Sequence, residues 1–291
     1  MKPVTAMRVP LATDLGGFVK LLRRLQMPHR VSEERDEQVV WAADEKMAAD
    51  IRELYQRFPD GNADVDLDLS QYQPQPRFTR PSLAAQARAC PATTFVLLLC
   101  LVVAVLTYLG DNVDTLHWLT FQDFSYDSQN LYFIPLATSL DAGQWWRLFT
   151  PMFLHFGVLH LAMNALWYWE LGKRVEILQG RINLLGLTLL IGLLSNVAQY
   201  GYSGPSLFGG LSGVLYGLLG HVFVFQWLAP NNIYRMPRGI LVMMLIWLVA
   251  CMTPLVSMFG QIANGAHVGG LLVGCVTGLL GGAFARRKLR A

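Results

Sequence analysis

The chain has 291 residues, of which 53% are hydrophobic and 15% charged, with a formal net charge of +3. Soluble domains average about 25% charged residues, which excludes a soluble fold for much of the chain. The charge is also uneven, because residues 1–90 hold 26 of the 43 charged side chains. We therefore expect a polar N-terminal domain followed by a membrane domain.

Residues 1–60 are expected to form a small cytoplasmic α+β domain. A pattern of strand, helix, strand, strand and helix runs through residues 4–58, and Asp14 and Asp44 stand where each helix needs an N-cap. Residues 61–91 are rich in Pro, Gln, Asp and Arg, which is typical of a linker. No catalytic cluster or phosphate-binding loop is visible in the first domain.

Apolar stretches of roughly transmembrane length follow. They are residues 92–110, 157–173, 182–201, 210–229, 239–256 and 262–284. The expected fold class is an all-α polytopic membrane protein, a six-helix bundle over residues 92–284, followed by a basic tail at 285–291. A further apolar piece, Trp146–Phe156, is broken by Pro151 and Gly157, and we expect it to be a loop that dips into the membrane interface.

Lys and Arg side chains gather in alternate loops, and this bias indicates the orientation of the spans. One side holds Arg77, Arg80, Arg88, Lys173, Arg174, Arg181, Arg235, Arg238, Arg286, Arg287, Lys288 and Arg290. The other side holds only Arg147 against five aspartates. Both termini are therefore expected in the cytoplasm, and loop 111–156 faces outward. In a bacterium, this is a multi-pass protein of the inner membrane.

A serine and a histidine fall at the same expected depth of the membrane. Ser212, within Gly-Leu-Ser-Gly at 210–213, lies near the outer end of the fourth stretch, and His267 lies about a turn and a half into the sixth. Polar groups are costly there and usually functional. A neutral imidazole can take the proton of a serine hydroxyl near pH 7. No Asp or Glu falls in the outer half of any stretch, so we expect a Ser–His dyad.

Further polar side chains are candidates for positioning and for an oxyanion hole. Tyr216, one turn after Ser212, can pack against the imidazole. His160 and Asn164 are spaced i, i+4 and share one helix face. Donors on that face, with the Ser212 backbone N–H, suit a developing oxyanion. His155 precedes them in the same region.

The glycines near these residues are explained by the close approach of other groups, since glycine has no side chain. Gly210 leaves room for the backbone to lie close to substrate. Gly270 and Gly274 form a small-xxx-small face, which would let the sixth stretch press against the fourth and bring the imidazole to the serine.

Each motif also has a purely structural interpretation. Gly-x-Ser-Gly in a membrane helix is by itself usually a packing motif, and His221, which has no matching motif, is interpreted as packing. His155 and His160 suggest metal ligands, but His-Glu-x-x-His is absent and no carboxylate lies at that depth. We therefore expect no metal and no cofactor. The shared depth of the dyad and the His/Asn face together favour an enzyme.

These residues resemble the rhomboid family of intramembrane serine proteases over about residues 92–284. The motifs that carry the resemblance are Trp-Arg at 146–147, His-x-x-x-x-His-x-x-x-Asn at 155–164, Gly-x-Ser-Gly at 210–213, and Ala-His-x-x-Gly at 266–270 with Gly274. The stretch Val39–Glu45 is similar to the cytoplasmic domain of bacterial GlpG-type rhomboids.

The resemblance implies a role for each candidate. Ser212 would be the nucleophile and His267 the general base. The oxyanion hole would comprise His160, Asn164 and the Ser212 backbone, with Tyr216 stacked on the imidazole. The fifth span and the loop after it would form a lateral gate or cap, with Trp247 as a gate residue. The stretch Thr253–Gln261 is about two residues longer than in similar rhomboids, which leaves the cap geometry open.

The leading hypothesis is hydrolysis of a peptide bond in or near a transmembrane helix of another membrane protein. Its expected partners are single-pass or polytopic transmembrane substrates and membrane lipid, without nucleic acid. The alternative is a catalytically silent, client-binding protein of the same fold; the family's inactive members lack the serine or the histidine, and this chain keeps both. A transporter is disfavoured because the sequence shows no clear repeat and no midplane carboxylate. The aspartyl class of intramembrane protease is set aside, because Asp111 ends the first span without the second glycine of that motif.

Overall fold

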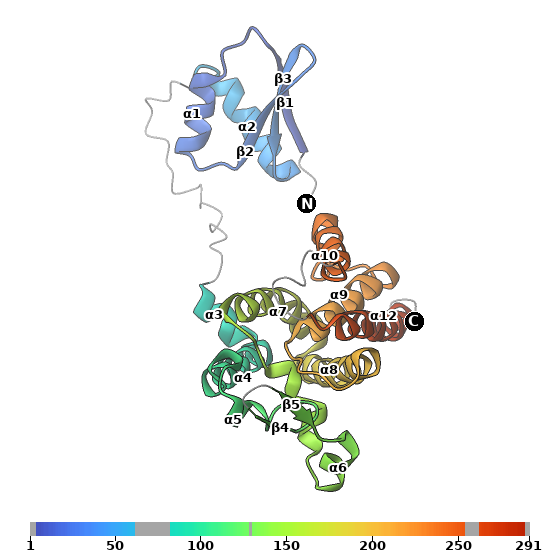
Figure 1. Ribbon diagram of the computed structural model, residues 1–291. Coiled ribbons are helices and arrows are strands. Elements are labelled where there is room, and N and C mark those ends of the chain that lie inside the picture. The colour runs from blue at the N-terminus through green and yellow to red at the C-terminus, as the bar shows by residue number, and fades with distance from the viewer. Residues whose placement is uncertain (1–3, 62–81, 128–129, 254–261, 289–291) are drawn as a thin grey trace. The chain divides into compact units, whose positions relative to one another are not determined.

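The computed structural model describes residues 4–61, 82–127, 130–253 and 262–288. The chain divides into two compact units, Met1–Arg80 and Pro81–Ala291, both drawn in Figure 1. Each unit has its own hydrophobic core, so each is described separately.

The first unit has the predicted order of strands and helices. Its elements are β1 (Val4–Pro10), α1 (Gly16–Arg24), β2 (His29–Glu34), β3 (Glu37–Ala42) and α2 (Glu45–Arg57). The sheet order is β1-β3-β2 and both pairings are antiparallel. Asp44 caps α2 by accepting the Met47 N–H at 2.8 Å. Phe18, Val40 and Ile51 are fully buried between the helices and the sheet, which confirms the small α+β domain.

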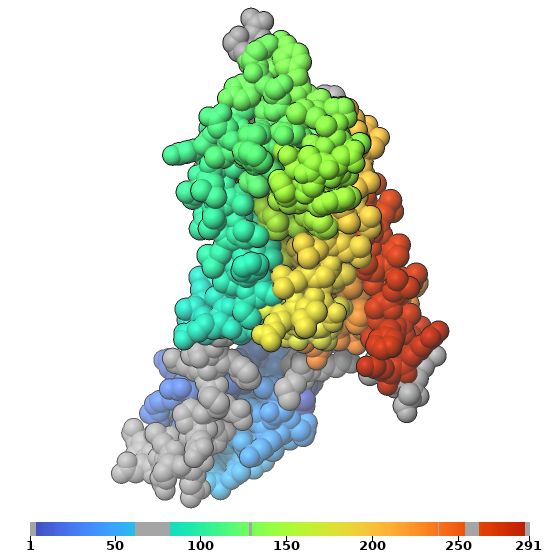
Figure 2. Space-filling view, turned by 90° about the horizontal axis from the view of Figure 1, so that it is seen from below, coloured from blue at the N-terminus to red at the C-terminus, as the bar shows by residue number. Residues whose placement is uncertain are grey.

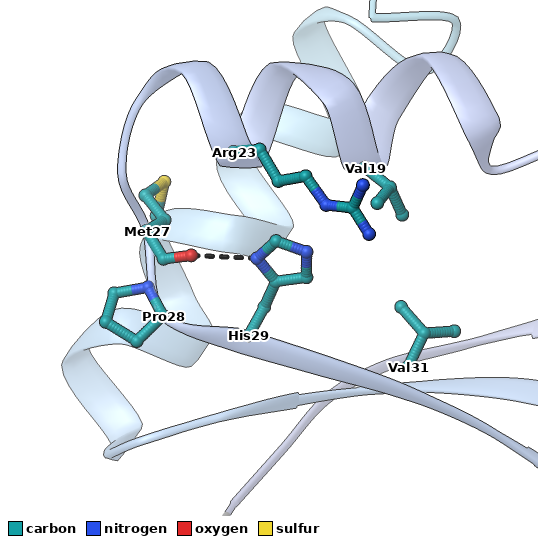
Figure 3. Close-up of a pocket in the computed structure, with 6 residues that line it drawn as sticks. All are labelled: Val19, Arg23, Met27, Pro28, His29 and Val31. Carbon is teal, nitrogen blue, oxygen red and sulfur yellow. Dashed lines mark hydrogen bonds between the residues drawn. The ribbon is translucent and has the colours of Figure 1, made fainter.

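A pocket of about 470 Å³ lies between α1 and β2 in this unit (Figure 3). Val19 and Val31 line it, together with Arg23 from the last turn of α1 and His29 from the start of β2. The His29 ring donates through Nδ1 to the Met27 carbonyl oxygen at 2.8 Å, which fixes the orientation of the ring. The pocket therefore combines an apolar floor with two basic side chains.

The second unit is built from apolar helices, which confirms the predicted fold class. They are α4 (Pro91–Leu106), α7 (Val158–Gln179), α8 (Arg181–Ser203), α9 (Ser212–Leu228), α10 (Arg238–Cys251) and α12 (Asn264–Lys288). Among the described residues, length and hydropathy alone make α8 and α12 long enough to cross a membrane. The short helix α3 (Leu83–Ala89) and α4 make a third span if this pair, bent by 107°, is counted as one. α9 and α10 are apolar but shorter.

Several predicted helix ends were wrong, and tertiary contacts explain the largest difference. The second predicted span stopped at residue 173, whereas α7 continues to Gln179. The charged residues in the last turns of α7 have partners. Arg174 pairs with Glu170, and Glu176 is buried and accepts the Ala92 N–H at 2.9 Å. Glu176 thereby caps the N-terminus of α4, which has no side-chain cap of its own.

Other observed helix boundaries also differ from the predicted ones. The predicted linker contains α3, which Ser82 caps by accepting the Ala85 N–H at 3.2 Å, and residues 62–81 of that linker lie outside the described residues. The first predicted span ends as helix at Leu106 rather than at residue 110, because the chain turns at Leu109 with φ of 57°. α12 runs to Lys288, into the predicted tail, and residues 289–291 are not described.

Glycines bring α9 and α12 side by side (Figure 1). A Cβ placed on Gly270 would overlap the Gly213 carbonyl oxygen, and one on Gly274 would overlap that of Gly217. The stripe continues at Gly278, where a Cβ would lie 2.5 Å from the His221 carbonyl oxygen. Small residues four apart thus let the two backbones touch.

The long loop between α4 and α7 is ordered around one buried cation. Its elements are α5 (Val113–Leu116), β4 (Phe124–Tyr126), β5 (Leu131–Phe133), α6 (Leu136–Asp141) and the 3-10 turns η3 (Trp145–Leu148) and η4 (Thr150–Phe153). Arg147 is fully buried and pairs with Asp123 at 2.8 Å, and its Nη1 donates to the His117 carbonyl oxygen at 2.6 Å. In Figure 2 this loop, in green, forms one end of the unit, above α4 in teal.

Candidate active site

Ser212 is the first residue of α9, directly after a tight turn. Gly210 in that turn has φ of +116°, a conformation that favours glycine. Its N–H donates to the Pro151 carbonyl oxygen at 2.9 Å, which ties the turn to η4. The turn therefore holds Ser212 at the N-terminus of a buried helix.

His267 lies opposite Ser212, in the first turn of α12. Its Nε2 is 2.8 Å from Ser212 Oγ, a hydrogen-bond distance. The imidazole is 5% exposed, and its Nδ1 is buried without a hydrogen-bond partner among the described residues. The contact between Gly213 and Gly270 brings the two helices close enough for this bond. The local arrangement is thus a serine and an imidazole, with no carboxylate bonded to Nδ1 in the described part of the chain.

Tyr216 lies one turn after Ser212 and packs on the imidazole. The centroids of its ring and the His267 ring are 4.9 Å apart, and the planes are inclined at 46°. The Tyr216 hydroxyl donates to the Met244 carbonyl oxygen of α10 at 3.1 Å. The tyrosine is therefore held between the imidazole and a third helix.

His160, on α7, lies against the turn before the serine. A Cβ on Gly210 would be 2.8 Å from His160 Nε2, so the ring occupies the space that the glycine leaves. Gly210 thus makes room for this ring, and the expected close approach of its backbone to substrate stays a prediction. The Phe156 N–H donates to His160 Nδ1 at 3.4 Å. A nitrogen that accepts a hydrogen bond carries no proton, so this contact favours the neutral tautomer with its proton on Nε2.

Asn164 lies one turn after His160 on α7 and bonds back to it. It is buried on α7, and its Nδ2 donates to the His160 carbonyl oxygen at 2.8 Å. One of its two N–H donors is therefore engaged by its own helix. The shared helix face brings His160 against the Gly210 turn, and the expected role of Asn164 beside the serine stays a prediction.

His155 is 1% exposed and supports His160 from the side. The ring centroids of the two histidines are 5.2 Å apart. His155 Nδ1 donates to the Phe153 carbonyl oxygen at 3.1 Å, while its Nε2 has no partner among the described residues. Within the described ranges, the His, Cys, Asp and Glu side chains form no group of three or more that could hold a metal ion.

Two polar residues that the sequence reasoning overlooked fix the start of α12. Gln199 of α8 accepts the Ala266 N–H through Oε1 at 3.0 Å. Asn264 donates through Nδ2 to the Cys251 carbonyl oxygen at 3.0 Å. Gln199 lies near the end of the apolar stretch 182–201, and the cost of a polar group in a membrane was the signal that could have identified it.

The remaining candidates lie away from Ser212 or outside the described residues. Trp247 is on α10 with 56% of its surface exposed, so it faces outward. His221 is buried and bonded to Gln179 and to Thr277 Oγ1, at 2.8 and 3.0 Å, which fits the packing interpretation. Of the predicted cap stretch, residues 254–261 lie outside the described residues.

Comparison with known families divides the chain much as its structure does. The Rhomboid domain model matches residues 142–284, which include every candidate residue named above. The Rhomboid N-terminal domain model matches residues 1–68. Together the matches cover more than two thirds of the chain. With the apolar helices of the second unit they indicate a multi-pass membrane protein, and the chain belongs to the rhomboid family.

Proposed function

We propose that this chain is an intramembrane serine endopeptidase that cleaves transmembrane segments of other membrane proteins. The observation that carries the proposal is the 2.8 Å hydrogen bond between Ser212 Oγ and His267 Nε2. Rhomboids are generally intramembrane serine proteases, and a buried serine–imidazole pair is the minimum arrangement for acyl transfer.

In the proposed reaction, His267 Nε2 takes the proton from the Ser212 hydroxyl as Oγ attacks the scissile carbonyl carbon. The imidazolium then protonates the leaving amine, and an acyl-enzyme remains on Oγ. Water, deprotonated by the same nitrogen, attacks the ester, and the proton returns to the serine as the acid departs. Because Nδ1 lacks a partner among the described residues, this is a dyad without an orienting carboxylate.

The developing oxyanion requires donors beside Ser212. His160 presents Nε2–H near the Gly210 turn, because the Phe156 N–H occupies Nδ1. The Ser212 backbone N–H is free of intrahelical bonding at the first position of α9, where the helix dipole also favours negative charge. Asn164 is assigned as a third donor through the amide N–H that its own helix does not use.

The substrate class follows from the chemistry of a helix in lipid. A helical substrate keeps its carbonyl groups in internal hydrogen bonds, so it must unwind locally before Oγ can attack. We expect substrates with small or helix-weakening residues near the membrane surface. Water reaches the acyl-enzyme through the polar region around His155, His160 and Asn164.

We further propose that the protein lies in a bacterial inner membrane with both termini in the cytoplasm, and that it is of the GlpG type. The orientation is supported by the concentration of Lys and Arg in alternate loops. The GlpG type is supported by the stretch Val39–Glu45 and by the match of residues 1–68 to the Rhomboid N-terminal domain model. With this orientation, Ser212 and His267 lie toward the periplasmic face, below the loop between α4 and α7.

The decisive experiment uses purified Ser212→Ala and His267→Ala variants with a transmembrane substrate in detergent. Loss of cleavage in both, and labelling of Ser212 by a fluorophosphonate in the wild type only, is the expected result. Full cleavage by either variant would exclude the dyad. A wild-type protein that neither cleaves nor reacts with the probe would indicate the catalytically silent, client-binding alternative.

A further inference from the structure

The edge strand β2 of the first unit is open for pairing. The sheet order β1-β3-β2 gives β2 a neighbouring strand on one side only. Its register with β3 is continuous from His29 to Glu34, and its backbone makes no hydrogen bond to the described residues outside that ladder. Such an edge presents unpaired N–H and C=O groups, to which a further strand can be added.

The opposite edge of the sheet, β1, is protected. Arg52 of α2 donates through Nη1 to the Ala6 carbonyl oxygen at 3.1 Å. The register of β1 with β3 shifts between Thr5 and Met7, and Pro10 at the end of β1 has no N–H to donate. A covering element, an irregular register and a proline are means by which proteins block an edge. The strand β2 has no proline and no register shift, so the two edges of one sheet differ.

A groove runs between β2 and α1 (Figure 3). Val19 of α1 and Val31 of β2 line both of its pockets, which have volumes of about 470 and 540 Å³. Both valines are partly buried and form an apolar floor common to the two pockets. The side chains of His29, Val31 and Glu33 share one face of β2, because alternate residues of a strand point the same way. A strand added to this edge would therefore place its own alternate side chains along the groove.

The two ends of the groove carry opposite charges. Arg23 and His29 line the first pocket, and Asp14 and Glu33 line the second. The side chains of Arg23 and Glu33 are exposed and make no hydrogen bond or ion pair with any described residue. His29 and Glu33 are four residues apart on one strand, a span of about 13 Å. Charges placed in this way favour a ligand whose own charges have the opposite order.

We propose that the groove between α1 and β2 binds an extended peptide segment of another protein, which pairs with β2 as an additional antiparallel strand. The peptide carries a basic residue opposite Glu33, an apolar residue opposite Val31 and an acidic residue opposite His29. The acidic residue also faces Arg23. Side chains directly opposite each other in an antiparallel pair lie about 4.5–5.5 Å apart, close enough for these contacts.

Main-chain hydrogen bonds and side-chain contacts have different parts in this binding. The bonds to the open edge of β2 supply affinity for any extended peptide, and the three side chains supply the selection. The antiparallel direction agrees with both existing pairings of the sheet. The binding function is separate from the proposed protease chemistry, because every residue that carries it lies in the first unit.

A second copy of this chain is the main competing occupant. The strand β2 itself has a basic, an apolar and an acidic residue at His29, Val31 and Glu33, so two copies could pair through this edge. Each copy, however, carries its own α1 beside the edge. Pairing would bring two such helices to the same side of the joined sheet, whereas a single strand needs only the room of the groove. The single peptide is therefore favoured.

The test measures binding of a designed peptide to the purified full chain in detergent by fluorescence anisotropy. All proteins carry Ser212→Ala, so that the proposed protease chemistry does not consume the peptide. The probe is dye-labelled Lys-Thr-Val-Thr-Glu with blocked termini, whose side-chain charges cancel. Its control, Thr-Lys-Val-Glu-Thr, has the same composition but places both charges on the face opposite the valine.

Charge reversal on the chain tests the two ends of the groove. Arg23→Glu and Glu33→Lys change exposed side chains that have no partner in the described part of the chain, so both proteins should keep the unfolding temperature of the parent. The matched control is Arg30→Glu, because Arg30 lies on the same strand as Glu33 but on its other face. The peptide Lys-Thr-Val-Thr-Lys tests whether Arg23→Glu can be rescued.

The expected result is that the probe binds about 10-fold or more tightly than the control peptide. Arg23→Glu and Glu33→Lys should each raise the Kd of the probe about 5-fold, because attraction between exposed charges becomes repulsion, while Arg30→Glu stays within about 2-fold. Arg23→Glu should bind Lys-Thr-Val-Thr-Lys about 3-fold more tightly than it binds the probe.

Backbone methylation of the peptide tests strand pairing directly. A strand in an antiparallel ladder directs its N–H groups alternately toward and away from its neighbour. Methylation of the valine nitrogen and methylation of the second threonine nitrogen should therefore have opposite outcomes, with binding lost in one peptide and kept in the other.

Four outcomes would overturn the inference. The first is no binding of the probe, and the second is equal binding of the probe and its control peptide. The third is an equal loss of binding in Arg30→Glu and Arg23→Glu. The fourth is a dimer of the peptide-free chain that Arg23→Glu or Glu33→Lys dissociates, because that result would assign the open edge of β2 to a second copy. None of these results bears on the chemistry of Ser212, which is tested by cleavage.

Discussion

Replacing Gly270 by alanine tests whether the contact between α9 and α12 holds the proposed dyad together. The added Cβ would overlap the Gly213 carbonyl oxygen, well inside the 3.0 Å that real Cβ contacts respect. The obstacle is backbone, so no side-chain rotation can relieve it. Since both helices are close-packed, one must move by about 1 Å to accommodate the methyl group.

The expected magnitude has a packing part and a geometric part. Overpacking of this kind typically costs about 1–3 kcal/mol of stability. Gly270 lies one turn after His267 and Gly213 directly follows Ser212, so the shift falls on the 2.8 Å bond itself. A displacement of about 1 Å at reacting groups can cost up to about 100-fold in rate, which corresponds to about 2.7 kcal/mol of barrier.

The assay measures kcat with a transmembrane substrate and thermal unfolding in the same detergent. The matched control is Gly201→Ala on α8, where nothing lies within 4 Å of the added Cβ. The control should be neutral or stabilised by about 0.5–1 kcal/mol, because alanine is a better helix former than glycine. If Gly270→Ala keeps wild-type kcat and wild-type unfolding, helix contact does not set the serine–imidazole distance.

Three further predictions follow from single contacts. Glu176→Gln should lower the unfolding temperature by several degrees, since it weakens charge-assisted bonds to the start of α4 that are worth about 1.5–3 kcal/mol each; unchanged unfolding would show that the buried carboxylate is dispensable. Asn164→Ala should reduce kcat by about 10-fold or more while a fluorophosphonate still labels Ser212, and loss of folding instead would indicate a structural role. Removal of residues 1–80 should leave cleavage of a detergent-solubilised substrate within about 2-fold of the full chain, because the site residues all lie in the second unit; loss of activity in a folded truncation would assign the first unit a part in catalysis.

The positions of the helices were predictable from hydropathy, but their ends were not. Apolar stretches must be helical in lipid because every backbone group needs an internal partner, and each of the six predicted stretches does contain a helix in the described residues. The end of α7 was missed because charged residues were taken as a boundary. Glu176 lies beyond the predicted end and is buried in the continuing helix, where the start of α4 satisfies its carboxylate, and a sequence does not display such a partner.

The proximity of Ser212 and His267 was predictable for a different reason. Two parallel spans with polar residues at one depth, and glycines at helical spacing beside them, leave few other arrangements. The direction of the Asn164 amide and the reach of Asn264 were not predictable. Both depend on which neighbouring backbone group is nearest, and that is fixed by the rotation and height of each helix in the bundle rather than by spacing along it.

The same contacts suggest how polar side chains are used in this bundle. Helix ends that lack a local cap need donors or acceptors from elsewhere, because little water reaches them. Glu176 of α7 accepts a backbone N–H at the start of α4, and Gln199 of α8 accepts one at the start of α12. Asn264, the first residue of α12, bonds instead to the Cys251 carbonyl oxygen at the end of α10. For a polar residue inside an apolar stretch of this chain, the first interpretation is therefore a hydrogen bond to the end of a neighbouring helix. A catalytic role is proposed only where the residue contacts another reactive side chain, as Ser212 and His267 contact each other.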